Sequence, residues 1–93
     1  MGKLKFSLNG HSNWVESLAY LGSEINFLAS GSYSGSIKLW NITNGRLVVD
    51  IDAANNGGHT NWITSLLALD DKGMFASGSL DTNIKIWKVT MEN

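Results

Sequence analysis

Hydrophobic residues in this chain occur in short segments of about four to seven residues, separated by clusters of Gly, Asn, Asp and Ser. Such segments, rich in Trp, Ile, Leu and Val, are typical of β-strands bounded by turns. No apolar stripe with a helical period extends over about 11 residues or more, so no helix is expected. The pattern therefore predicts an all-β protein.

The chain contains two copies of one unit. Residues 10–18 read GHSNWVESL and return 48 residues later as GHTNWITSL, with six of the nine positions identical. Further on, LASGS at 28–32 returns as FASGS at 75–79, and IKLW at 37–40 returns as IKIW at 84–87. An internal repeat of this length indicates a protein built from stacked, similar units.

Each copy predicts a run of strands joined by turns. The expected strands lie over residues 14–20, 27–32, 36–41 and 46–51 in the first copy, and over 62–69, 74–79 and 83–88 in the second. Asn44-Gly45 favours a tight hairpin turn, because glycine supplies the positive φ that such a turn needs. The second copy contains no fourth segment of this kind. Apolar and polar residues alternate over residues 3–8, and this predicts an eighth strand before the first copy.

The order of these motifs resembles the WD-repeat (Trp-Asp repeat) β-propeller family. Gly-His opens each copy, and Ala-Ser-Gly-Ser, a turn and a strand that includes Trp follow it. The resemblance implies an all-β fold of two four-stranded antiparallel propeller blades in one segment over residues 1–93, with repeat one at 10–51 and repeat two at 58–90. Asn41 and Lys88 follow Trp where the family favours Asp, and Ser34 stands where the second copy has Asp81.

The resemblance also implies a set of hydrogen-bonded side chains that ties each blade together. An indole N–H can only donate, a hydroxyl can both donate and accept, and a carboxylate can orient an imidazole. A neutral hydroxyl in the aspartate position makes a weaker bond than a carboxylate, so repeat one is expected to be the looser blade. The set is His59, Ser77, Asp81 and Trp87 in repeat two, and His11, Ser30 and Trp40, with Ser34 in the aspartate position, in repeat one.

Four large side chains are candidates for binding a partner. By the resemblance, the loop before each repeat and the turn after its second strand emerge at the end of a propeller where family members usually receive partners. Trp14 and Trp62 lie just after those loops, while Tyr33 and Leu80 lie in the turns. Exposed aromatic and apolar groups on one face are typical anchors of a protein interface. The alternative is that Trp14 and Trp62 fill the groove between blades.

Composition excludes several classes of function. The 93 residues carry a formal net charge of −1, so no basic field favours nucleic acid or an anionic membrane. There is no cysteine, and the two histidines occupy the same position of the repeat, so neither a metal site, a cofactor site nor a catalytic site is expected. With neither a signal peptide nor a membrane span in the sequence, we expect an intracellular, cytoplasmic location.

Two blades leave apolar sheet faces uncovered, because closed propellers use about four to eight blades. Copies that each supply two blades would close rings of four, six or eight blades, and we favour a trimer or tetramer. The other interpretation is that further blades of a larger propeller complete the fold. Either way, the expected function is a non-enzymatic scaffold for protein or peptide partners. The alternative function is a multivalent propeller that binds sugars or other small ligands.

Overall fold

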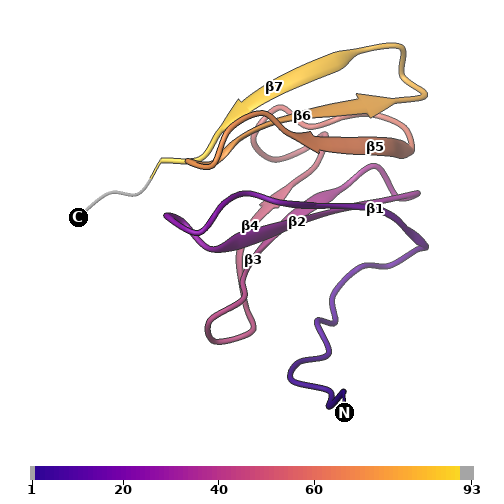
Figure 1. Ribbon diagram of the computed structural model, residues 1–93. Helices are drawn as coiled ribbons and strands as arrows, with labels where there is room; N and C mark the ends of the chain where they lie inside the picture. Colours follow the sequence, from indigo (N-terminus) through magenta and orange to yellow (C-terminus); the bar gives the residue numbers. More distant parts are fainter. Residues whose placement is uncertain (1, 91–93) are drawn as a thin grey trace.

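Two antiparallel β-sheets make up the fold, and the all-β prediction is confirmed. The computed structural model describes residues 2–90. The first sheet has four strands in the order β1-β2-β3-β4, and the second has three in the order β5-β6-β7, which Figure 1 shows as two layers. The strands are β1 (Val15–Tyr20), β2 (Phe27–Ser32), β3 (Ile37–Asn41), β4 (Arg46–Ile51), β5 (Ile63–Ala68), β6 (Met74–Ser79) and β7 (Ile84–Lys88).

Turn residues and register follow the repeat. Gly45 has φ 75° in the β3–β4 hairpin, where its N–H donates to the carbonyl of Asn41 over 2.8 Å, so the Asn-Gly turn forms as expected. The first strand of each repeat carries a bulge at the same place, between Val15 and Ser17 in β1 and between Ile63 and Ser65 in β5. The first three strands of the two repeats therefore pair in the same register.

The core lies between the two sheets. Alternate residues of β2, β3 and β4 point towards the second sheet, as period-two alternation requires. Phe75 and Ile63 meet them from the second sheet and are fully buried. Burying each large apolar side chain contributes about 1.5–3 kcal/mol, so this single interface holds the two sheets together. The buried cluster comprises Ala19, Leu21, Phe27, Ala29, Ile37, Leu39, Ile51, Ile63 and Phe75.

The second blade differs from the expected four strands. Residues 3–8 are not a strand in the structure, and β7 has a neighbour on one edge only within residues 2–90. The physical reason is that a strand forms only when it pairs with another strand, and the contact of this segment with the first blade is that of the Phe6 ring with Gly45 in the β3–β4 turn. Figure 1 shows this segment leading away from both sheets. Among the described residues, no helix is long and apolar enough to cross a membrane.

Candidate functional site

In repeat two, four side chains form a continuous series of hydrogen bonds through the blade. The indole N–H of Trp87 donates to Oγ of Ser77 over 2.8 Å, and Nε2 of His59 lies 2.7 Å from the same oxygen. Nδ1 of His59 lies 2.8 Å from Oδ2 of Asp81. Because a carboxylate only accepts, Nδ1 of a neutral His59 carries the proton and Nε2 accepts from the Ser77 hydroxyl. Each member of the chain therefore has a partner.

Asp81 is the anionic end of this chain. Burial alone would raise the pKa of its carboxyl, but the N–H of Asn83, the His59 ring and the N–H of Thr60 outweigh burial and lower the pKa to about 2. The Thr60 N–H lies 3.1 Å from Oδ2 and the Asn83 N–H 2.9 Å from Oδ1. Asp81 thus fastens the loop before β5 to the β6–β7 turn.

The same positions in repeat one form a shorter chain. The indole N–H of Trp40 donates to Oγ of Ser30 over 2.8 Å, and Nε2 of His11 lies 2.6 Å from that oxygen. Nδ1 of His11 is buried and has no hydrogen-bond partner among the described residues. Ser34, which takes the place of the aspartate, bonds instead to the hydroxyls of Ser32 and Ser36. The series of hydrogen-bonded side chains in repeat one therefore ends at the imidazole of His11.

The surroundings of His11 favour its neutral form. Burial, and then the positive charge of Lys38, lower the pKa of His11, while Asp50 raises it and only partly offsets them. Lys38 itself is held by an ion pair of 2.7 Å between its Nζ and Oδ2 of Asp50. A carboxylate at position 34 would counter these effects, but this chain has a serine there.

Trp14, Tyr33 and Trp62 form a row of aromatic rings across the boundary between the two blades, which we call the aromatic row. Tyr33 and Trp62 stack with ring centroids 4.3 Å apart and planes 2° apart. Trp14 lies on the other side, with its centroid 5.3 Å from that of Tyr33 and its plane tilted by 43°. Trp14 is 70% exposed and Trp62 43% exposed. The two tryptophans therefore bridge the blades and also present surface to solvent.

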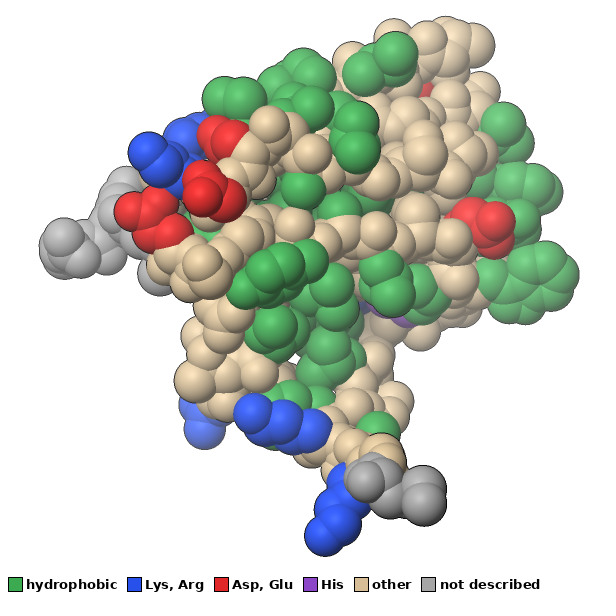
Figure 2. Space-filling model, in the orientation of Figure 1, with side chains coloured by type: hydrophobic (Ala, Val, Ile, Leu, Met, Phe, Trp, Pro, Cys, Tyr) green, Lys and Arg blue, Asp and Glu red, His purple; other side chains and the backbone are tan. Residues whose placement is uncertain are grey.

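Backbone hydrogen bonds hold the row in place. The N–H of Tyr33 donates to the carbonyl of Trp14 over 2.9 Å, and the N–H of Leu80 donates to the carbonyl of Trp62 over 3.1 Å. Leu80, the counterpart of Tyr33 in repeat two, is 52% exposed. In Figure 2 hydrophobic side chains gather at the end of the molecule where β1 begins, around one acidic group.

Glu16 is a member of this surface that our sequence analysis missed. Loss of hydration raises the pKa of the Tyr33 hydroxyl, and the negative charge of the nearby Glu16 raises it further. Glu16 is exposed, and the second repeat has Thr64 at the equivalent position. The one signal in the sequence was this difference in charge between otherwise similar repeats.

On the outer face of repeat two, apolar side chains are exposed whose counterparts in repeat one are buried. Ile84 is 77% and Ile86 60% exposed, while their counterparts Ile37 and Leu39 are buried against the second sheet. Leu67 and Leu69 are likewise exposed, and their counterparts in repeat one are buried. The outer face of repeat two thus carries the apolar pattern that receives a following blade.

The outer face of repeat one shows the converse. Leu18 and Tyr20 are exposed, while their counterparts Leu66 and Ala68 pack against the core. The outer face of repeat one therefore resembles the surface through which repeat two packs against repeat one. The outer face of repeat two resembles the surface of repeat one that receives this contact. The two outer faces are complementary by construction, in the head-to-tail sense that makes a heterologous contact.

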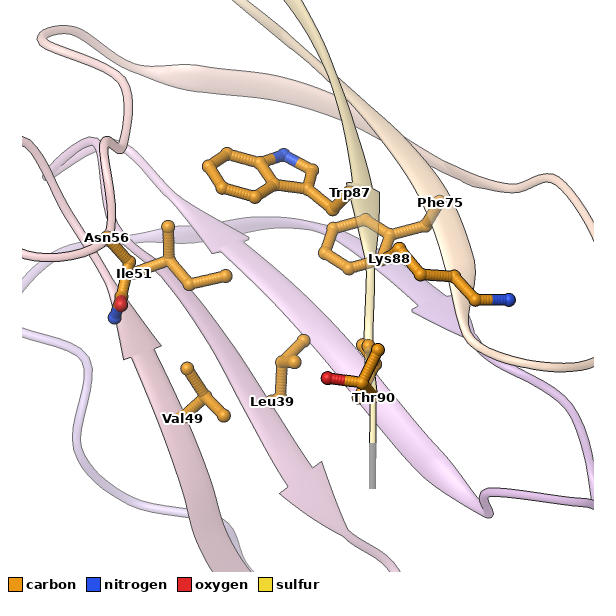
Figure 3. Close-up of a pocket in the computed structure, with 9 residues that line it drawn as sticks. Leu39, Val49, Ile51, Asn56, Phe75, Trp87, Lys88 and Thr90 are labelled. Atoms are coloured by element: carbon orange, nitrogen blue, oxygen red, sulfur yellow. The ribbon is translucent and has the colours of Figure 1, made fainter. Parts of the chain in front are cut away.

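A cavity of about 370 Å³ lies between the sheets beside β7. Figure 3 shows Trp87 and Phe75 of the second sheet on one side of it and Leu39, Val49 and Ile51 of the first sheet on the other. Val49 and Ile51 belong to β4 of the first sheet. Among residues 2–90 the second sheet has no strand equivalent to β4. Most of the cavity lining is apolar, and Asn56, Lys88 and Thr90 are the polar residues that also line it.

Comparison with known proteins agrees with the internal repeat and the blade architecture. The family model WD40, "WD domain, G-beta repeat", matches residues 2–41 and 54–88. The chain belongs to the WD-repeat family. The two WD repeats predicted from the sequence are confirmed by this match.

Relatives of the WD repeats are longer proteins. The chain is 30% identical to the small ribosomal subunit protein RACK1 of Neurospora crassa over 94% of its own length, and spans 28% of that protein. It is 33% identical to the ribosome biogenesis protein ytm1 of Pyrenophora tritici-repentis over 84% of its length, and spans 17% of that protein. The crystal structure of the computationally designed Ika4 protein superposes with a TM-score of 0.72 at 33% identity, covering 90% of this chain and 46% of that one.

Proposed function

We propose that this chain is a non-enzymatic scaffold that binds protein or peptide partners at the aromatic row and the adjoining Leu80. The observation that carries the proposal is the exposure of Trp14 and Trp62 on one face, fixed by stacking on Tyr33. Rigid aromatic side chains give large contact areas at low entropic cost and are the usual anchors of protein interfaces. The ribosome-related names of two relatives support protein partners and an intracellular location.

The scaffold is completed by further blades, and we propose that a second copy of the chain supplies them. The exposed Ile84 and Ile86 of one copy would cover the exposed Leu18 and Tyr20 of the next, which repeats the contact between the two blades within one chain. Repetition of this head-to-tail contact closes a ring of four, six or eight blades, and we favour the trimer or tetramer. The alternative is that further blades of a larger propeller cover these faces. This alternative is supported by the two relatives, because the chain spans only 28% and 17% of their lengths.

Residues 3–8 of one copy would then pair with β7 of its neighbour. This segment corresponds in the repeat to β4, so Ser7 takes the place of Asp50 and Lys85 that of Lys38. Lys38 and Asp50 form an ion pair in the first blade, whereas Lys85 would meet only the hydroxyl of Ser7. The join would fill the cavity beside β7 and cover a strand edge that otherwise favours aggregation.

The assembly is tested by light scattering during size-exclusion chromatography. Wild-type chain is expected to have the mass of two, three or four copies, and Ile84→Asp, which puts a charge on the outer face of repeat two, is expected to give a folded monomer. Ser23→Asp, in the exposed β1–β2 turn, is the matched control and keeps the assembly. Ser7→Asp is expected to slow dissociation through Lys85, and Lys85→Gln to cancel that effect. A wild-type chain that stays monomeric, or that only aggregates, contradicts self-assembly and supports the larger propeller.

Partner binding is tested with a displayed library of random peptides. The wild-type chain is expected to enrich peptides that it no longer binds after Trp14→Ala or Tyr33→Leu, the second change placing there the residue that repeat two has. Glu24→Gln, at the opposite end of the blade, leaves binding unchanged. Equal binding by wild type and both row variants contradicts the proposed surface. A glycan array that is bound by wild type and not by Trp14→Ala, with no peptide enriched, supports the sugar-binding alternative.

A further inference from the structure

We infer that the aromatic row binds the guanidinium group of an arginine side chain, with Glu16 as the anionic partner. This inference rests on the proposed function of the row and names the chemistry of its ligand. The Trp14 ring packs against the Tyr33 ring, and Glu16, two residues after Trp14 in the chain, lies near enough for its charge to act on the tyrosine hydroxyl. A single group seated on the exposed Trp14 ring, and reaching towards Glu16, therefore meets an aromatic side chain and a carboxylate together.

The charges at this end of the molecule favour a cation. The loops and turns that border the row, residues 9–14, 32–36, 52–62 and 79–83, contain two aspartates and no lysine or arginine. Asp81 is already committed to His59 and to two backbone N–H groups, so it adds negative potential without offering a free acceptor. Glu16 is exposed, so its carboxylate oxygens can accept hydrogen bonds from a bound cation.

The geometry favours a planar guanidinium over an ammonium group. Tyr33 and Trp62 are parallel and in contact, so they leave no gap between them and no walls at right angles to enclose a methylated ammonium. The open faces of the row are flat, and a guanidinium stacks on flat aromatic faces while its N–H groups reach a carboxylate in the same plane. Arginine satisfies both neighbours at once, whereas lysine, a compact point charge, satisfies mainly Glu16.

The test uses four capped pentapeptides that differ only in the central residue, which is arginine, citrulline, lysine or trimethyllysine. Citrulline keeps the shape of arginine and removes its charge. Binding to the chain in its natural assembly is followed by Trp fluorescence and by the indole N–H signals in NMR. The arginine peptide is expected to bind at least about fivefold more tightly than the others, the combined effect of an exposed cation–π contact and an exposed ion pair. Equal binding of citrulline, or tighter binding of lysine or trimethyllysine, overturns the inference.

Two variants separate this inference from the proposed function. Glu16→Gln is expected to lower the affinity for the arginine peptide to that for the citrulline peptide, and Glu24→Gln to leave it unchanged. Tyr33→Leu is expected to abolish binding of all four peptides. Peptides that bind equally and lose binding only with Tyr33→Leu would overturn the arginine inference and leave the proposed surface standing. Arginine binding that survives both Glu16→Gln and Tyr33→Leu would overturn both. Melting curves establish that each variant is folded.

Discussion

Nδ1 of His59 lies 2.8 Å from Oδ2 of Asp81. The same atom of His11 in the first repeat is buried without a partner among the described residues, because position 34 is a serine. An unpaired buried polar atom loses its hydration without gaining a hydrogen bond, and this lowers the stability of the folded state. The two blades therefore share a fold and differ in how completely their polar side chains are paired.

Ser34→Asp is expected to stabilise the chain. A carboxylate at position 34 takes the place that Asp81 has in repeat two and gives Nδ1 of His11 an acceptor. The expected gain is about 1 kcal/mol, which corresponds to a rise of about 4–8 °C in melting temperature for a domain of this size. The carboxylate should also raise the pKa of His11, which NMR titration of the imidazole C–H signals measures. Unchanged stability together with an unchanged His11 titration contradicts the assigned geometry.

Asp81→Asn is expected to destabilise the chain at neutral pH and to flatten its acid profile. Because the pKa of Asp81 in the folded chain is about 2, below the ordinary value of 3.8, the folded state favours the carboxylate. That stabilisation is complete above about pH 4 and disappears as the pH falls to about 2. Melting temperatures measured between pH 7 and pH 2 should therefore converge for wild type and variant at the acid end. A constant difference over this range would show that the charge of Asp81 is not what stabilises the fold.

Gly31→Ala and Gly78→Ala form a matched pair that separates folding from assembly. A Cβ on Gly31 would overlap the side chain of Ile63 across the blade interface, whereas a Cβ on Gly78 meets only hydroxyls of its own blade. Overlap in a packed interface typically costs about 1–3 kcal/mol, so Gly31→Ala should lower the melting temperature. In the proposed assembly the neighbour's Val15, the counterpart of Ile63, would face Gly78, so Gly78→Ala should chiefly weaken association. Equal effects of the two changes on the folding of a dilute, monomeric sample would contradict the interface.

Thr82→Gly is expected to stabilise the second blade. Thr82 has φ 76°, a left-handed conformation that a β-branched residue rarely adopts, and its counterpart Gly35 has φ 90°. Removing this strain is expected to contribute about 1 kcal/mol. Chemical denaturation measures the gain, and Thr82→Ala, which keeps a Cβ, is the control expected to contribute much less. Loss of stability with Thr82→Gly would show that the threonine side chain has a role beyond the turn.

Much of the fold could be predicted from local patterns. The strands at 27–32, 46–51 and 74–79 were predicted with the bounds they have, because turn residues flank each of them directly. The other four begin one residue later than predicted, and β5 also ends one residue earlier. Residues 3–8 have a strand pattern and yet are not a strand, because alternation describes a side-chain face and does not supply a partner edge.

The aromatic row could be predicted only in part. The family resemblance implied that Trp14, Tyr33, Trp62 and Leu80 lie at one end. The stacking of Tyr33 on Trp62, however, joins residues of two different blades and depends on how the sheets pack. The two interpretations of the tryptophans, exposed or filling the groove, turned out to be compatible. A ring can be stacked across a boundary and still present its other face to solvent.

The difference between Tyr33 and Leu80 sets the valency of any closed ring. In the proposed assembly, seams within a copy carry Tyr33 against Trp62, and seams between copies carry Leu80 against Trp14 of the neighbour. The two kinds of seam alternate around the ring, so docking positions with a central tyrosine occur once per polypeptide and not once per blade. A bivalent ligand would have to bridge every second seam, and its optimal tether length would report the spacing directly.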